Sequence, residues 1–188
     1  MRHQLSIVMA KHIGDVLTPE LAVVMVKELM AMSSDIKADD LCMAHKVERL
    51  EDALMALPQP ELKISHAWAP GLWARSIELP AGTVIVGAVH RTDNLVQLSM
   101  GSLQCIAEDG TVVTRHAGDV WLCRKGMKNT VVALEDCKWT NFMHNPSDET
   151  NVDKLVEMFS HAKADELIGG AKNRQLLAQQ ASNIELEG

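Results

Sequence analysis

Four polar side chains between residues 90 and 144 have the chemistry of ligand-binding groups: His90, Asp93, Gln97 and His144. Imidazoles and carboxylates bind a transition metal when three or four of them converge. If His90 and His144 met Gln97 or Asp93 in one cavity, a weak metal site would result, but spacing alone does not bring them together. We therefore take His90, Gln97 and His144 as candidate residues of a ligand pocket, with His90 and His144 as the weaker alternative of a metal site.

Three roles are open for His90: a metal ligand, a polar group of a ligand pocket, or a hydrogen-bonded interior or rim histidine. The patterns of other catalytic sites are missing, since the sequence has no Gly-x-Ser-x-Gly and no glycine-rich phosphate loop after a strand. The four cysteines form no Cys-x-x-Cys pair and have no zinc spacing, so we expect reduced core thiols: Cys42, Cys105, Cys123 and Cys137.

Charge and hydropathy exclude two classes of partner. The 188-residue chain has a net charge of −7, and its longest basic run is Arg124-Lys125, so we expect no nucleic-acid partner. No stretch approaches the ~20 apolar residues of a membrane span, so we expect no membrane partner. The N-terminus lacks the apolar core of a signal peptide, which predicts a cytoplasmic protein.

The elements that must position these residues are short strands. Runs with alternating apolar residues are separated by turn residues, which predicts a sandwich or barrel rather than a parallel sheet. Glu108-Asp109-Gly110 is a strong hairpin signal between two such runs. The predicted strands are Leu72–Leu79, Thr83–His90, Leu95–Met100, Leu103–Ala107, Thr111–Arg115, Val120–Cys123, Thr130–Leu134 and Lys138–Met143.

Helices are predicted on both sides of this β region. Residues 1–58 have helical spacing of apolar residues from Leu5 onward, with an almost wholly apolar helix over 19–32 and a heptad-like seam over 40–57. The seam packs either on its own domain or on another copy. Thr150 or Asn151 is expected to cap a helix that continues towards Gly169, and a last polar helix is predicted over 171–180. This gives three regions: 1–60, 61–146 and 147–188.

Several segments of the β region together resemble a cupin, the small jelly-roll barrel, and more narrowly the short cupin-like proteins of bacteriophages. The resemblance covers residues 66–145 and implies a mainly β fold with flanking helices. It is carried by Ala69-Pro70-Gly71-Leu72-Trp73-Ala74-Arg75, Pro80-Ala81-Gly82-Thr83, Gly87-Ala88-Val89-His90, Glu108-Asp109-Gly110, Ala117-Gly118-Asp119 and Glu135-Asp136-Cys137-Lys138-Trp139-Thr140.

The resemblance also implies where metal ligands would stand. Metal-binding cupins offer several histidines and an acidic residue, but here those positions fall on Ala88, His90, Asn94 or Leu95, and Asn129. One imidazole does not hold Fe, Mn, Ni or Zn, because affinity comes from several ligands acting together. The metal site is therefore expected to be degenerate and the protein to carry no cofactor.

We therefore expect a non-enzymatic cupin-fold structural or interaction module. It would form a homo-oligomer through the barrel and helices 19–32 and 40–57, or bind another protein. The resemblance implies a bacteriophage virion or assembly protein in the host-cell cytoplasm. The rivals are a metal-dependent dioxygenase or isomerase that uses His90, and a small-molecule-binding cupin.

Overall fold

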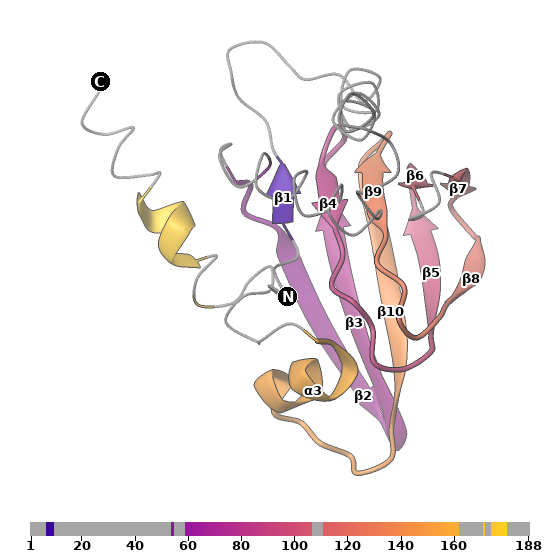
Figure 1. The fold of residues 1–188 in the computed structure, drawn as a ribbon, viewed down its shortest axis with the longest axis vertical. Helices are drawn as coiled ribbons and strands as arrows, with labels where there is room; N and C mark the ends of the chain where they lie inside the picture. Colours follow the sequence, from indigo (N-terminus) through magenta and orange to yellow (C-terminus); the bar gives the residue numbers. More distant parts are fainter. Residues whose placement is uncertain are drawn as a thin grey trace, which may run out of the picture.

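A computed structural model describes residues 59–106 and 111–161, together with residues 54, 171 and 174–179 and the backbone of residues 7–9 (Figure 1). Ten strands form two five-stranded sheets, which we call sheets A and B. Sheet A has the order β1-β4-β9-β6-β7, and sheet B has the order β2-β3-β10-β5-β8. Neighbouring strands in both sheets are antiparallel.

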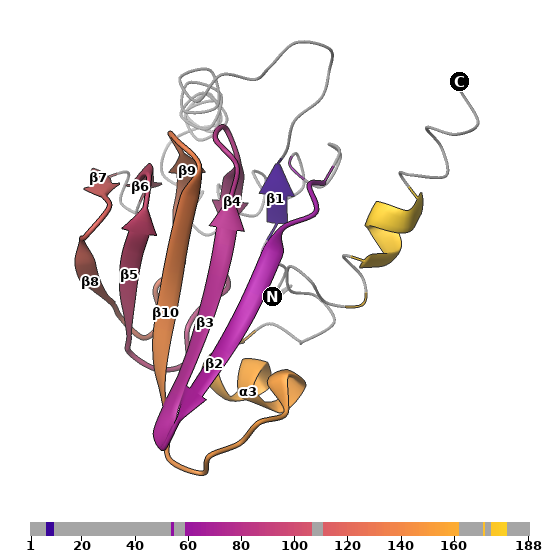
Figure 2. The same cartoon turned by 180° about the vertical axis from the view of Figure 1, so that it is seen from behind.

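Sheet A contains β1 (Ile7–Met9), β4 (Val84–Val86), β6 (Ser102–Ile106), β7 (Val112–His116) and β9 (Thr130–Ala133). Sheet B contains β2 (Lys63–Ala69), β3 (Gly71–Leu79), β5 (Asn94–Met100), β8 (Val120–Cys123) and β10 (Cys137–Asn145). The helix α3 (Val152–Phe159) follows β10. Figures 1 and 2 show it near the end of the domain where β2 turns into β3.

The strand order is that of a jelly roll. Each of four strands in sheet B is followed or preceded in sequence by the strand at the same place in sheet A. The four sequence neighbours are β3 and β4, β10 and β9, β5 and β6, and β8 and β7. This is the double Greek-key arrangement of eight strands, and β1 and β2 extend the two sheets at one edge. The mainly β, jelly-roll architecture predicted from the sequence is therefore confirmed.

The inner faces of the two sheets supply the core because alternate residues of a strand share one face. One cluster joins the sheets through buried apolar residues: Leu62, Ile77, Leu79, Ile85, Leu98, Leu103, Val131, Ala133 and Cys137. A second cluster attaches α3 to sheet B through Trp73, Met143, Leu155, Val156 and Phe159. Three of the predicted core thiols are free cysteines in this region: Cys105, Cys123 and Cys137.

Some boundaries differ from the predictions. The prediction of a helix is wrong for residues 7–9, which form β1. This strand pairs with β4 and is the edge strand of sheet A, so strand pairing outweighs the helical spacing there. The strand β2 was not predicted. The strand predicted over 83–90 is observed only over Val84–Val86. The Gly87 N–H still donates to the Asn129 carbonyl (2.8 Å), but by His90 the chain has left the sheet and bridges Ser160 instead.

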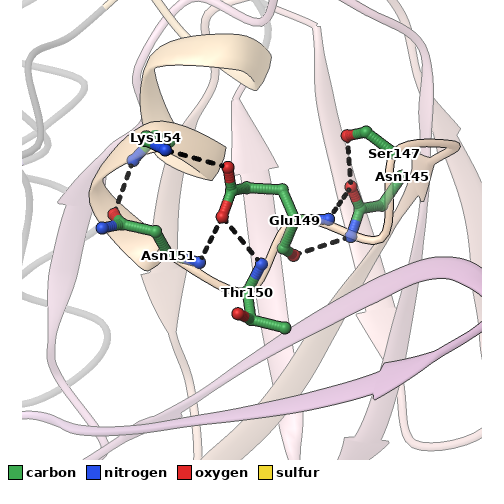
Figure 3. Close-up of polar contacts among 6 residues, drawn as sticks. All are labelled: Asn145, Ser147, Glu149, Thr150, Asn151 and Lys154. Carbon is green, nitrogen blue, oxygen red and sulfur yellow. Dashed lines mark hydrogen bonds and ion pairs between the residues drawn. The ribbon is translucent and has the colours of Figure 1, made fainter.

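The turn before α3 is fixed by side chains that replace missing backbone partners (Figure 3). The Glu149 carboxylate accepts hydrogen bonds from the backbone N–H groups of Thr150 and Asn151 (3.0 and 2.8 Å) and pairs with Lys154 (3.4 Å). Asn151, one of the two predicted caps, accepts from the Lys154 N–H (3.1 Å). The buried Asn145 side chain holds the other end of the turn through the Glu149 backbone.

The helix α3 is shorter than predicted. It ends at Phe159, because Ser160 is extended (φ −131°, ψ 162°) and bridges His90 instead of continuing towards Gly169. Residues 174–179 are helical and mostly exposed, in agreement with the predicted last helix. The predicted helices over 19–32 and 40–57 and the turn at 108–110 lie outside the described residues, except for Leu54, which is helical and fully buried.

Within the described part of the chain, no helix is long and apolar enough to cross a membrane.

Candidate functional site

A cavity of about 120 Å³ lies inside the barrel, between the two core clusters. Most of its wall is apolar or aromatic, with contributions from both sheets and from α3. Its polar side chains are Arg75, His90, Asn129, Asn141 and Ser160, and the thiols of Cys105 and Cys123 also line it. An apolar wall with a few converging polar groups is the usual character of a small-molecule site.

Arg75 is the one lining residue with a permanent charge among the described residues, and it lies on β3, the second strand of sheet B. It is paired with His66 of β2 on one side and with Asn141 of β10 on the other. Burial lowers the pKa of Arg75 to about 10, so the guanidinium remains protonated at neutral pH. The cavity wall therefore includes a cation on an otherwise largely apolar strand face.

Three side chains form a hydrogen-bonded chain that ends at His90. The Asn141 amide donates to the Asn94 oxygen (2.8 Å), and the Asn94 amide then faces His90 Nδ1 (3.1 Å). Because Asn94 presents its N–H group to the ring, Nδ1 is the acceptor and the proton of the neutral imidazole resides on Nε2. Asn94 is buried, whereas His90 and Asn141 are half-buried, so the middle of this chain is the part shielded from bulk water.

The imidazole of His90 is held in its neutral form. Burial lowers its pKa from the ordinary value, and the positive charge of Arg75 lowers it further. The same two causes lower the pKa of His66, whose Nδ1 accepts from the Trp73 indole N–H (3.2 Å). Both rings are therefore uncharged hydrogen-bonding groups at neutral pH.

The segment that carries His90 is joined to the end of α3. Its backbone bridges Ser160, the Arg91 N–H donates to the Phe159 carbonyl (2.9 Å), and Arg91 Nε donates to the Ser160 carbonyl (2.7 Å). Phe159 lies 5.7 Å from Trp73, measured between ring centroids. The helix α3 thus covers one end of the cavity and is held there by backbone as well as side-chain contacts.

The three predicted pocket residues do not converge. His90 lines the cavity, but Gln97 and His144 are not among the lining residues. The reason is strand alternation: Val96 and Met143 face the cavity, so the next residues along, Gln97 and His144, face the opposite side of sheet B. Asp93 is also elsewhere, since it accepts from the Lys125 N–H (2.7 Å) in a turn.

The positions at which the cupin resemblance implies metal ligands do surround the cavity. Ala88, His90 and Asn129 line it, and Asn94 contacts His90. This donor set does not fit a Fe, Mn, Ni or Zn centre, because it offers one imidazole whose Nδ1 already accepts from Asn94. Among the described residues, no three histidine, cysteine or acidic side chains gather around a common point.

The cavity thiols also do not have the character of metal ligands or nucleophiles. Burial raises the pKa of Cys105 and of Cys123 to about 11, so both are protonated at neutral pH.

The sequence analysis did not select Arg75, Asn94 or Asn141 as site residues. A signal for Arg75 was present, since it shares a strand face with Trp73 and Ile77, and a charge on an apolar face is unusual. Asn94 stood at a position where the cupin resemblance implies a metal ligand, but no signal marks Asn141. The two residues lie 47 positions apart and meet only through the pairing of β5 with β10.

Comparison with known proteins gives structural similarity only. No protein-family model and no curated protein sequence matches the chain. Similar solved structures include the Clostridium difficile EutQ protein, which is 17% identical and has a TM-score of 0.39, with coverage of 46% of this chain and 69% of that one. A cupin-2 domain protein from Shewanella frigidimarina is 18% identical with a TM-score of 0.39, covering 50% and 91%. KdgF from Halomonas sp. is 20% identical with a TM-score of 0.41, covering 46% and 82%.

The domain is a cupin-type jelly roll. Its strand order carries this assignment, since cupins have the double-sheet, eight-stranded arrangement described above. Fold alone does not imply an activity, so the function has to be argued from the cavity.

Proposed function

We propose that this protein is a non-catalytic, small-molecule-binding jelly-roll protein whose site is the barrel cavity. One observation carries the proposal: the space beside His90 is a cavity with several converging polar groups and not a filled apolar interior. Arg75, Asn141 and His90 come from different segments and reach the same space, which a purely structural barrel does not require.

Binding without chemistry is favoured by the character of the lining groups. The cavity thiols are protonated, and the donor set around His90 does not fit a metal centre. Nδ1 of His90 accepts a hydrogen bond from the Asn94 amide, and an amide does not give up its proton in catalysis. The ring therefore donates one hydrogen bond from Nε2. The absence of a cofactor stays a prediction.

A variant that fills the cavity tests this proposal. Ala88 lines the cavity, whereas Ala74 of β3 lies opposite Phe142 and outside the lining. In ligand-observed NMR with a library of small fragments, Ala88→Phe is expected to lose the fragments that bind the natural protein, and the matched variant Ala74→Phe is expected to keep them. Added volume in a packed interior costs ~1–3 kcal/mol, so urea unfolding is measured for both variants.

If no fragment binds the natural protein, or if folded Ala88→Phe binds the same fragments equally well, the cavity is not the binding site and the proposal is wrong.

A second role, self-association, is supported by the outer face of sheet B. Strand register places Ala74, Phe142, Leu95 and Leu122 in one row across four strands. Leu95 and Leu122 are 50% and 43% exposed, and Val120 beside them is 56% exposed. Contiguous exposed apolar side chains are typical of a protein–protein interface. We propose that this row contributes to a homo-oligomer.

Sedimentation velocity tests the second role. The natural chain is expected to sediment as an oligomer, and the double variant Leu95→Lys, Leu122→Lys is expected to be monomeric. Val112→Lys, Val113→Lys is the matched control, because those valines are also exposed (37% each) but lie on β7 of sheet A. An unchanged oligomer in the first variant would remove this face as the interface. The bacteriophage role stays a prediction from the resemblance.

A further inference from the structure

The described cavity wall offers a ligand no unpaired charge. Arg75, its one permanently charged side chain among the described residues, already has an interaction partner within the protein. The thiols of Cys105 and Cys123 are protonated, because burial raises their pKa to about 11. The His90 imidazole is neutral, because burial and Arg75 lower its pKa. A charged ligand would therefore lose its hydration without gaining a free counter-charge, which is unfavourable.

Three side-chain atoms of the wall have no hydrogen-bond partner among the described residues. The amide groups of Asn141 and Asn129 each use an N–H, on the Asn94 oxygen (2.8 Å) and on a cysteine sulfur (3.9 Å), but no described group donates to their oxygens. In the His90 ring, Nδ1 accepts from Asn94, so Nε2 carries the proton, and no described group accepts from it. The wall thus offers one hydrogen-bond donor and two acceptors.

These three atoms are open to a molecule that enters the cavity. In the described part of the chain, polar side-chain atoms that are sealed from solvent without a partner occur elsewhere, at Gln104, Arg115 and Trp139. The residues that carry the free donor and the two free acceptors are instead half-buried and line the cavity. A polar group that both donates and accepts would satisfy the donor and one acceptor together.

The remaining wall decides what else the ligand contains. Three tryptophans (Trp73, Trp121 and Trp139) and several aliphatic side chains line the cavity, and they offer contact to an apolar body. The cavity volume of about 120 Å³ lies below the ~300–1,000 Å³ of drug-sized sites, and near the ~150 Å³ of an engineered cavity that holds benzene. The apolar body is therefore expected to be about as large as one benzene ring.

We propose that the cavity binds a small uncharged molecule with an apolar body and one hydroxyl group. The hydroxyl oxygen accepts a hydrogen bond from His90 Nε2, the hydroxyl donates to the side-chain oxygen of Asn129 or Asn141, and the tryptophan-lined wall surrounds the apolar body. This inference rests on the proposed function, since it names the ligand class of the same site.

Four probes of similar size test the hydroxyl and the charge without any mutation. At neutral pH phenol is an uncharged hydroxyl compound, benzene lacks the hydroxyl, benzoate is an anion and benzylamine is a cation. In isothermal titration calorimetry, phenol is expected to bind at least about fivefold more tightly than benzene, a ratio that corresponds to ~1 kcal/mol and to one net hydrogen bond. Benzoate and benzylamine are each expected to bind at least about tenfold more weakly than phenol, because each would bury an unpaired charge.

Two variants then assign the preference to the polar groups of the wall. His90→Phe keeps a ring and removes the donor, and Asn129→Leu removes an acceptor, so each is expected to lower the ratio of phenol to benzene affinity, His90→Phe to about one. The matched controls are His144→Phe and Gln97→Leu, which lie outside the cavity lining and are expected to keep the ratio. Urea unfolding verifies that each variant is folded.

A measurement on the natural protein does not depend on the folding of any variant. In ¹⁵N NMR of the histidine rings, saturating phenol is expected to shift the Nε2 resonance of His90 and to leave that of His144 in place.

The outcomes separate this inference from the proposed function. Equal binding of phenol and benzene, a ratio that survives in folded His90→Phe, or an unmoved His90 resonance overturns the hydroxyl assignment. Benzoate or benzylamine that binds as tightly as phenol overturns the uncharged class. In these cases, and also if library fragments bind but phenol does not, the cavity remains a binding site. If neither a probe nor a library fragment binds, the proposed function fails together with the inference.

Discussion

Replacing Asn94 by aspartate is expected to reverse the proton arrangement at His90. Asn94 accepts from Asn141 (2.8 Å) and donates to His90 Nδ1 (3.1 Å). A carboxylate of the same shape still accepts from Asn141, but it has no N–H for the ring. Nδ1 must then carry a proton itself, so that the imidazole becomes the donor.

The size of the effect follows from the distance. A negative charge in hydrogen-bond contact with an imidazole favours its protonated form and is expected to raise the pKa of His90 by about 1–3, which corresponds to ~1.4–4 kcal/mol. In the natural protein the pKa of His90 lies below its ordinary value of 6.5. The substitution therefore works against both burial and the repulsion from Arg75.

Long-range ¹H–¹⁵N NMR of the histidine rings distinguishes the two arrangements. The natural protein is expected to show His90 with its proton on Nε2, and Asn94→Asp is expected to show a proton on Nδ1 together with the raised pKa. Asn129→Asp is the control, because it places a carboxylate in the same cavity wall without contact to Nδ1. A proton already on Nδ1 in the natural protein, or an equal rise of the pKa in both variants, would refute the hydrogen-bonded chain as described.

Three further predictions concern stability. Gly101→Ala is expected to lower the free energy of unfolding in urea by ~2–5 kcal/mol, because φ is +79° and a Cβ would overlap a backbone carbonyl of the β9–β10 turn. The control Gly118→Ala has a φ of +101° but open space around the Cβ, so it is expected to cost only ~1–2 kcal/mol. Equal costs would contradict the clash. Phe159→Ala is expected to cost ~3–5 kcal/mol, since the ring is buried against the barrel, and a loss below 1 kcal/mol would show that α3 is not docked there. Folding lowers the pKa of His66 and His90 below 6.5, so the unfolded chain binds more protons than the folded chain just below that pH. The free energy of unfolding is therefore expected to fall as the pH drops from 7 towards 5. A His66→Gln, His90→Gln variant is expected to lose this slope. An unchanged slope in that variant would assign the pH dependence to other groups.

Much of the fold was readable from local pattern. Seven of the eight predicted strands end within two residues of the observed ones, because the alternation of apolar and polar residues is a property of each strand by itself. Failures occurred where partners decide the conformation. Residues 7–9 become a strand only because β4 offers a free edge, and α3 stops at Phe159 because Ser160 pairs with His90.

The candidate site divides in the same way. From the sequence, the resemblance to cupins placed Ala88, His90 and Asn129 at motif positions around a barrel interior, and it predicted too few ligands there for a metal. Only the tertiary structure decided which other side chains reach the same space. Arg75 reaches the cavity from β3, and Asn141 reaches His90 through Asn94. These groups come from strands that are distant in sequence, and the register between such strands depends on packing across the whole barrel, which no local pattern records.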